Sequence, residues 1–225
     1  MRPTRHVIVF VRAPQIGTVK RRLSTDIGVF AAWRFYRSET ARLIAELRPH
    51  QHHGFRLAVT PDCFTHRGRF WPDGITRIPQ GPGNIGERMA RVVHAHPHEP
   101  VVIIGSDVPG LKSKHVEAAF VALETHDAVI GPAHDGGYWL IGFRQRPTTP
   151  GRWRPGLFRN IRWSGPHAME DTLRAFPRGW RVARLDTLSD VDTKQDFDAL
   201  GGRQLIGRKF PGRNFSGRQL LGRHG

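Results

Sequence analysis

The sequence VVIIGSDVPGL, residues 101–111, decides the fold of this chain. Its four β-branched residues at 101–104 are typical of a parallel strand that other elements cover on both faces. The turn that follows therefore lies at the carboxyl edge of a sheet, where open α/β folds bind their ligands. Asp107 in this turn is placed to hold a metal ion against a nucleotide. Because Asp, Pro and Gly are also ordinary turn residues, Asp107 could instead cap the next helix.

Strands and helices alternate on both sides of this stretch. Apolar runs predict further strands at residues 6–11, 55–60, 128–132 and 138–143. Helical spacing puts Phe30, Trp33, Ile44 and Leu47 on one side of a long helix, and predicts helices at 85–94, at 116–123 with Ser113 as N-cap, and around 169–176. A last strand and a short helix are expected within 182–200. This alternation predicts one α/β domain, residues 1–200, with a mainly parallel sheet flanked by helices.

The composition is that of a soluble globular protein. Of the 225 residues, 38% are hydrophobic, and the longest apolar runs are far shorter than the roughly 18 residues that a membrane helix needs. The N-terminus, MRPTRHVIVFVRAP, is interrupted by Arg12 and lacks a small-residue cleavage site, so we interpret it as the first strand and not as a signal peptide. The single Cys63 excludes an intramolecular disulfide and favours the cytoplasm.

Basic residues dominate the charge. The net charge is +16, and residues 201–225 carry six Lys or Arg and no acid, which leaves 29 basic against 19 acidic residues in the first 200. A basic body of this kind suits a polyanionic small molecule and does not require nucleic acid. In the tail, Gly-Arg recurs every five residues from Gly202 to Gly222. This repeat predicts a disordered basic arm, not a stacked β-solenoid, and leaves nucleic-acid binding by the arm open.

The first predicted strand runs into RAPQIGTVKRRL, residues 12–23. Gly17 permits a tight turn, while Arg12, Lys20 and Arg22 can converge on phosphate oxygens. The segment is neither a GxxxxGK[ST] P-loop nor a GxGxxG dinucleotide motif. A solvated basic helix start is the other interpretation.

A second polar segment, GPAHDGGYWLIG at residues 131–142, puts Asp135 at the end of a strand. Gly136 and Gly137 would let a ligand approach the backbone, and Tyr138 opens the next strand. The alternative is a glycine-rich hairpin with a packed tyrosine. Further on, Asp190 and Asp192 in LSDVDTKQD could add a second metal ligand, or the segment could simply begin a helix.

The residues do not indicate a zinc site or covalent nucleophilic catalysis. The histidines around residues 50–53 and 94–98 have no established zinc spacing. There is no GxSxG motif, and Cys63 has no evident partner base, so covalent nucleophilic catalysis is not indicated.

Six segments follow one another in an order that is characteristic of a protein family. The chain contains, in sequence, VFVRAPQIGTVKRRL, GNIGERM, IIGSDVPGL, GPAHDGGYWLIGF, LFRNIRW and LSDVDTKQDF. Together they resemble a bacterial family of transferases with a GT-A type, nucleotide-diphospho-sugar transferase fold. Its members are often labelled glycosyltransferase, and the family is distantly similar to the molybdopterin and phospholactate nucleotidyltransferases. The resemblance covers roughly residues 5 to 200 and leaves the Gly-Arg tail outside.

The resemblance implies roles for particular residues. It makes Asp107 the ligand of a Mg²⁺ or Mn²⁺ ion. It places the nucleotide loop at Arg12, Ala13, Pro14, Gly17, Lys20 and Arg22, further nucleotide contacts at Gly86 and Arg88, and the acceptor side at Asp135, Gly136, Gly137 and Tyr138. Arg21 stands where the family usually has threonine, which could change the phosphate contacts of the loop.

We therefore expect a cytoplasmic, metal-dependent transferase that passes a sugar from a nucleotide-activated donor to an unknown acceptor. The metal on Asp107 would stabilise charge on the diphosphate, aided by Arg12 and Lys20, and Asp135 would serve as general base toward a hydroxyl acceptor. One alternative is nucleotidyl transfer with release of pyrophosphate, although the first loop lacks the doubled glycines usual in such enzymes. Another is a non-catalytic nucleotide-binding or RNA-binding protein that uses the basic tail.

Overall fold

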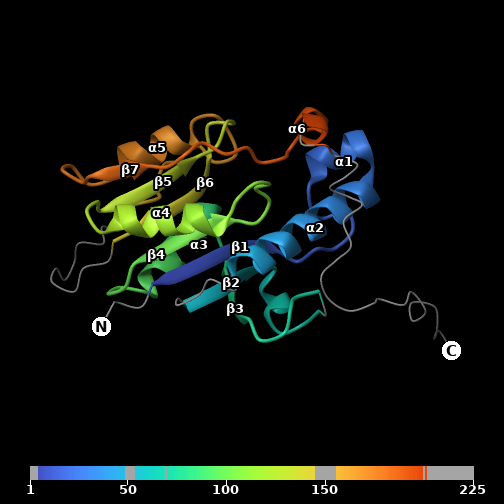
Figure 1. Cartoon of the computed structure of the whole chain (residues 1–225), viewed down its shortest axis with the longest axis horizontal. Coiled ribbons are helices and arrows are strands. Elements are labelled where there is room, and N and C mark those ends of the chain that lie inside the picture. Colours follow the sequence, from blue (N-terminus) through green and yellow to red (C-terminus); the bar gives the residue numbers. More distant parts are fainter. Residues whose placement is uncertain (1–4, 49–53, 69, 145–155, 200, 202–225) are drawn as a thin grey trace.

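The computed structural model describes residues 5–48, 54–68, 70–144, 156–199 and 201. They form a seven-stranded sheet with helices on both faces (Figure 1). The strands are β1 (His6–Arg12), β2 (Gly54–Thr60), β3 (Thr76–Pro79), β4 (Val101–Gly105), β5 (Ala128–Pro132), β6 (Tyr138–Phe143) and β7 (Val182–Arg184). Their order across the sheet is β3-β2-β1-β4-β6-β5-β7.

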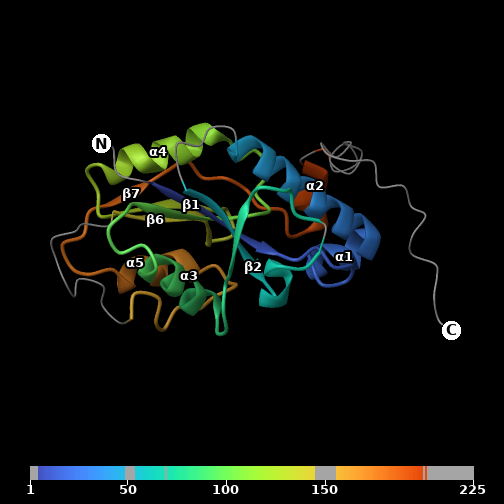
Figure 2. The same ribbon diagram turned by 90° about the horizontal axis from the view of Figure 1, so that it is seen from below.

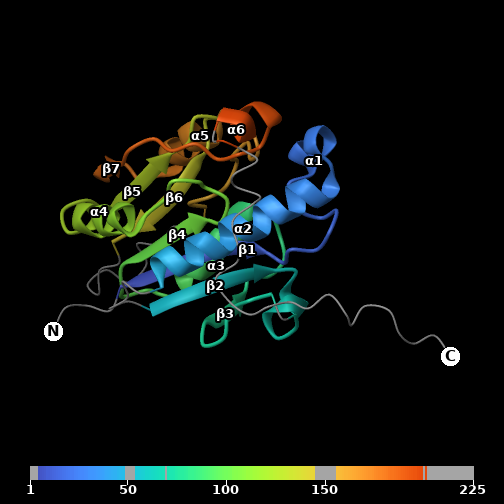
Figure 3. The same ribbon diagram turned by 45° about the vertical axis from the view of Figure 1, so that its right-hand side comes forward.

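The helices make two layers. They are α1 (Arg21–Ile27), α2 (Val29–Leu47), α3 (Ile85–His94), α4 (Ser113–Leu123), α5 (Ala168–Ala175) and α6 (Lys194–Ala199), with a short 3-10 helix η1 at Asp62–Thr65. Helices α2 and α4 cover one face of the sheet, and α3 and α5 cover the other (Figure 2). Helices α1 and α6 lie near each other at one end of the molecule (Figure 3).

The sheet is parallel except for β6. Strand β1 pairs in parallel with both β2 and β4, and β5 pairs in parallel with β7. Strand β6 follows β5 through a tight turn, so it returns antiparallel, and it also pairs antiparallel with β4. The turn between β5 and β6 therefore reaches the same edge of the sheet as the turn after β4. The prediction of a mainly parallel sheet is confirmed.

The core explains why residues 101–104 are apolar without alternation. Val102 and Ile104 pack on the side of α2 and α4, whereas Val101 and Ile103 pack on the side of α3. Both faces of β4 are thus removed from water, which is the condition that favours continuous β-branched runs. A third, smaller cluster joins α1, α2 and α6 through Leu23, Ala32, Phe35, Val191 and Phe197.

Phe30 lies in the first turn of α2, in the long helix that the spacing predicts, and is 67% exposed. One local prediction was wrong. Ser113 is not the N-cap of α4 but its first residue, and its hydroxyl donates instead to the main-chain carbonyl of Glu46, at 2.9 Å. The N-cap is Lys112, whose backbone N–H donates to Nδ1 of His115.

The predicted tail and its domain boundary lie almost wholly outside the described residues, since only Gly201 of that segment is described. Disorder of the tail therefore stays a prediction. Among the residues that the structure describes, no helix is long and apolar enough to cross a membrane.

Candidate functional site

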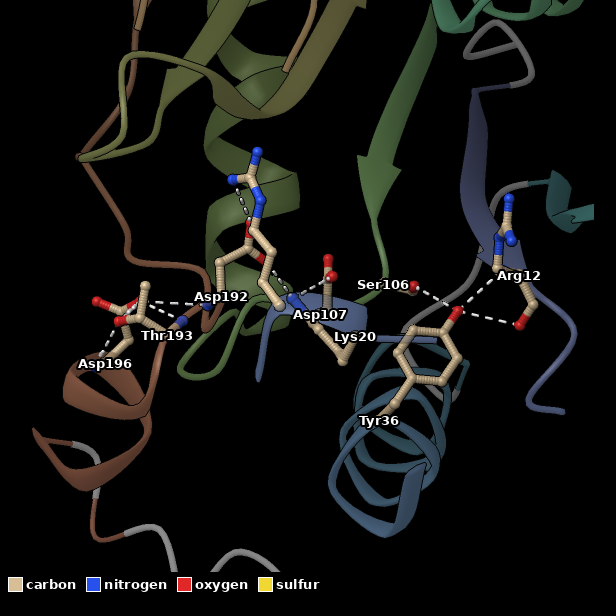
Figure 4. Close-up of polar contacts among 9 residues, drawn as sticks. Arg12, Lys20, Tyr36, Ser106, Asp107, Asp192, Thr193 and Asp196 are labelled. Atoms are coloured by element: carbon tan, nitrogen blue, oxygen red, sulfur yellow. Dashed lines mark hydrogen bonds and ion pairs between the residues drawn. The ribbon is translucent and has the colours of Figure 1, made fainter. Parts of the chain in front are cut away.

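A buried lysine joins two loops at the carboxyl edge of the sheet. Nζ of Lys20 lies 2.7 Å from Oδ2 of Asp107, in the turn after β4, and 2.8 Å from Oδ1 of Asp192, just before α6 (Figure 4). The Lys20 side chain is only 4% exposed. The backbone of Lys20 is left-handed, with φ 48° and ψ 50°. Residues other than glycine rarely adopt this conformation, and it is often retained at functional sites.

Charge is concentrated around this lysine. Burial alone would lower the pKa of the Lys20 amine, but the charges of Asp107 and Asp192 outweigh burial and raise it, so the amine is an ammonium. The pKa of Asp190 is raised to about 6 by burial, with further contributions from the negative charges of Asp135 and Asp192. The negative charges of Asp107, Asp135 and Asp192 therefore act on Asp190, while the single buried ammonium of Lys20 opposes them.

The Asp192 loop begins a helix, which is one of the two roles that the sequence left open, and its role as a second metal ligand stays a prediction. Oδ2 of Asp196 accepts hydrogen bonds from the backbone N–H of Thr193, at 2.8 Å, and of Asp192, at 3.2 Å. In return, Oγ1 of Thr193 accepts from the backbone N–H of Asp196 (Figure 4). These bonds begin α6 and leave the side chain of Asp192 directed at Lys20.

Tyr36 of α2 connects the first loop to the Asp107 loop. Its buried hydroxyl accepts from the backbone N–H of Arg12, at 2.8 Å, and donates to the carbonyl of the same residue, at 3.0 Å. Oγ of Ser106, next to Asp107, lies 3.2 Å from the same hydroxyl (Figure 4). The sequence analysis missed Tyr36, and the only available signal was that a buried tyrosine hydroxyl needs a polar partner.

Arg42, six residues further along α2, holds the other end of the Asp107 loop. Its guanidinium donates to the carbonyls of Val108 and Leu111, each at 3.2 Å. Nε of Arg42 also donates to Oε2 of Glu39, at 2.8 Å, and Glu39 is 1% exposed. Helix α2 therefore fixes the loop on both sides of Asp107.

The remaining residues of the predicted nucleotide loop contact other parts of the chain. The guanidinium of Arg12 contacts the carbonyl of Thr18, at 3.4 Å, and the exposed Arg22 reaches to 3.9 Å from Asp192. Gly17 is left-handed, with φ 78°. Ala13 is buried and its N–H donates to the Thr60 carbonyl, whereas the Pro14 carbonyl accepts from the Trp33 indole.

Gly86 and Arg88, predicted to contact the nucleotide, have structural partners of their own. A Cβ at Gly86 would lie 2.6 Å from Cζ2 of Trp163 and 2.8 Å from Cβ of Phe158, so glycine is required there by packing. Nε of Arg88 donates to the carbonyl of Gly83, at 2.8 Å. Their predicted nucleotide contacts stay predictions.

The β5–β6 turn is a glycine-rich hairpin with a packed tyrosine, which was the alternative interpretation of this segment, and its predicted contacts with a ligand stay predictions. Oδ1 of Asp135 accepts from the N–H of Gly137, at 2.8 Å, while the carboxylate contributes to the field at Asp190. Gly136 is left-handed, and a Cβ there would collide with the Pro166 carbonyl. The largely buried Tyr138 has a raised pKa because of burial, and Thr172 lies 3.4 Å from its hydroxyl. The structure thus brings Asp135 toward the site and packs Tyr138 in the core.

The donor atoms at the site suit a hard divalent cation that also binds phosphate. In the part of the chain that the structure describes, no group of three or more His, Cys, Asp or Glu is placed to hold a metal. Asp107 and Asp192 offer carboxylate oxygens, and Mg²⁺ is commonly held by one or two carboxylates together with substrate phosphates. The ammonium of Lys20, itself a cation, lies between these two groups.

Comparison with known proteins identifies the family. Residues 43–165 match the model of the DUF2064 family, described as an uncharacterized protein conserved in bacteria. The chain is a member of the DUF2064 family. A solved structure from Desulfovibrio desulfuricans G20, described as a "putative nucleotide-diphospho-sugar transferase", is 30% identical to this DUF2064 chain, with a TM-score of 0.71. The match covers 87% of the DUF2064 chain and 85% of the other.

Structures with lower sequence identity share only the fold with this DUF2064 protein. Glucosyl-3-phosphoglycerate synthase from Mycobacterium tuberculosis, solved with Mn²⁺, UDP and phosphoglyceric acid, is 13% identical with a TM-score of 0.53, over 91% of this chain and 76% of that one. Rv0371c from Mycobacterium tuberculosis H37Rv is 17% identical with a TM-score of 0.50, over 88% and 98%. The search of curated proteins finds no match. The predicted GT-A type fold is confirmed.

Proposed function

We propose that this protein is a metal-dependent transferase that uses a nucleotide-activated sugar donor. The observation that carries the proposal is the buried Lys20 between Asp107 and Asp192, at the sheet edge where α/β folds bind ligands. The relative of 30% identity is described as a transferase of this class, and the synthase that shares the fold was solved with Mn²⁺ and UDP.

Each residue of the site has a proposed part. Asp107 and Asp192 would hold Mg²⁺ or Mn²⁺, which supplies Lewis-acid stabilisation of the diphosphate leaving group when bound. Arg12, Lys20 and Arg22 would bind phosphate oxygens, since they lie at the end of β1, at the N-cap of α1 and in its first turn.

Asp135 is the proposed general base. Its carboxylate is oriented by the Gly137 N–H and lies near enough to Asp190 to raise the pKa of that residue. A carboxylate in this position would accept the proton of an acceptor hydroxyl as the sugar is transferred.

The products of turnover test this proposal. The protein is incubated with Mn²⁺ and a panel of nucleoside diphosphate sugars and nucleoside triphosphates, with and without a small-molecule cell extract as the source of acceptor, and phosphorus NMR records the products. We expect release of a nucleoside diphosphate that depends on Asp107. Stoichiometric pyrophosphate would replace the proposal with nucleotidyl transfer. Nucleotide binding without either product would support a non-catalytic protein.

A further inference from the structure

Lys20 occupies the place at which a metal ion would use Asp107 and Asp192. The ammonium contacts one oxygen of each carboxylate, at 2.7 and 2.8 Å. The side chains of Asp107 and Asp192 are 33% and 40% exposed, whereas that of Lys20 is 4% exposed. A cation from solvent can therefore reach the two carboxylates, but each of them already contacts the ammonium of Lys20.

The two cations exclude each other. A divalent ion bound to the same two carboxylates would lie within a few ångströms of the ammonium. At such a distance, repulsion between a double and a single positive charge strongly disfavours binding of both cations, even at a high effective dielectric constant. Moving Lys20 away removes this repulsion, but the ammonium then loses both of its carboxylate partners, and an unpaired buried charge is strongly unfavourable.

We propose that Lys20 is an internal cation that competes with the divalent metal for Asp107 and Asp192, and that a diphosphate receives the ammonium when the metal displaces it. This inference rests on the proposed function. Because the metal needs Lys20 to leave and Lys20 needs a new anion, metal and diphosphate bind weakly apart and tightly together. The site therefore recognises the metal–diphosphate complex.

The local structure allows Lys20 to move. Its left-handed backbone is strained, and the side chain makes no capping hydrogen bond to α1. The loop before it turns at Gly17, around which a Cβ would meet nothing within 4 Å. The lysine side chain is a flexible four-carbon stem that can redirect its ammonium without a change of fold.

Binding of Mn²⁺ alone to the full chain, measured by electron paramagnetic resonance of the free ion, tests the competition. We expect Lys20→Met to bind Mn²⁺ at least about tenfold more tightly than the parent, since the competing charge is gone. Adding Asp107→Asn to Lys20→Met should remove the gain. Lys112→Met is the matched control, because it deletes the charge of an exposed lysine outside the site, and we expect a change below about threefold.

A measurement on the parent protein covers the case in which Lys20→Met does not fold. Lys20 is one of five lysines, and Lys112 and Lys194 are exposed. Acetylation of each lysine is followed by peptide mass spectrometry. We expect Lys20 to react slowly, to react several-fold faster with saturating Mn²⁺, and to be protected again when pyrophosphate is added with Mn²⁺, while Lys112 and Lys194 do not change.

The outcomes separate this inference from the proposed function. Unchanged or weaker Mn²⁺ binding by a folded Lys20→Met, or a reactivity of Lys20 that saturating Mn²⁺ does not alter, would overturn the competition. The release of a nucleoside diphosphate from a sugar donor would be unaffected by that result. Conversely, the competition can hold in a protein that turns over no donor.

Discussion

Tyr36 lies with its hydroxyl 3.2 Å from Oγ of Ser106, the residue that precedes Asp107. The same hydroxyl exchanges hydrogen bonds with the backbone of Arg12, at the end of β1. One side chain of α2 thus ties the proposed phosphate loop to the proposed metal loop. Tyr36 is a positioning residue, since it acts on the site through its neighbours.

Replacing Tyr36 with phenylalanine should weaken the site as well as the fold. The change leaves the N–H and carbonyl of Arg12 without their buried partner, which costs about 1–3 kcal/mol of unfolding free energy. Urea unfolding measures this loss, and calorimetric titration with Mn²⁺ and nucleotide measures the effect on binding. The matched control is Tyr138→Phe, because Tyr138 is also largely buried, but its hydroxyl lies at the longer distance of 3.4 Å from Oγ1 of Thr172. Equal effects of the two variants on binding would contradict a positioning role for Tyr36.

Arg42→Met should destabilise the protein more than most single changes. It leaves the carboxylate of Glu39, 1% exposed, without the guanidinium that pairs with it, and removing one partner of a buried ion pair costs about 3–5 kcal/mol. We expect about 3 kcal/mol, because the Arg42 side chain is itself partly exposed. Urea unfolding of Glu39→Gln combined with Arg42→Met should recover part of this loss. A double variant less stable than Arg42→Met would show that Glu39 has another partner of equal importance.

Asp107→Asn should leave the protein folded and abolish metal-dependent nucleotide binding. The substitution keeps the shape of the side chain and removes the charge, while Asp192 still pairs with Lys20. Thermal unfolding with nucleotide, with and without Mn²⁺, measures the effect, because a ligand that binds only the folded state raises the unfolding temperature. Asp135→Asn is the comparison, and we expect it to keep the Mn²⁺-dependent shift and lose turnover. A full shift in Asp107→Asn would remove Asp107 from the metal site.

Asp190→Asn should stabilise the metal-free protein at neutral pH. The pKa of Asp190 is about 6 in the folded protein, above its ordinary value of 3.8. Between these values the folded state binds a proton that the unfolded chain has released, so stability falls as pH rises through this window, and the loss is complete above about pH 6. The variant should gain about 1–3 kcal/mol of unfolding free energy at pH 7.5 and nothing near pH 3.5. Urea unfolding at several pH values checks this, with the exposed Asp198→Asn as control. A gain that does not change with pH would contradict the burial of the charge.

Local sequence predicts an element when its neighbours along the chain decide it. The run at 101–104 could be predicted as a strand buried on both faces, and helix α3 begins and ends at the expected residues, because β-branched content and helical spacing are properties of adjacent residues. The exposure of Phe30 could not be predicted in this way. Its helical spacing is correct, but its exposure depends on where α2 meets the sheet, which the neighbouring residues do not determine.

The sequence by itself determined the alternating α/β fold, the carboxylate after β4 and the basic loop after β1, because these follow from local patterns and from the rule that parallel strands end at one edge. Only the tertiary structure decided that Lys20 meets Asp192, 172 residues away, and that Tyr36 meets Ser106, 70 residues away. These contacts depend on how α1, α2 and α6 pack together through their shared apolar cluster. The sequence does not show which partner a charged or polar side chain will have, because that side chain pairs with whichever complementary group the packed helices and strands bring within a few ångströms.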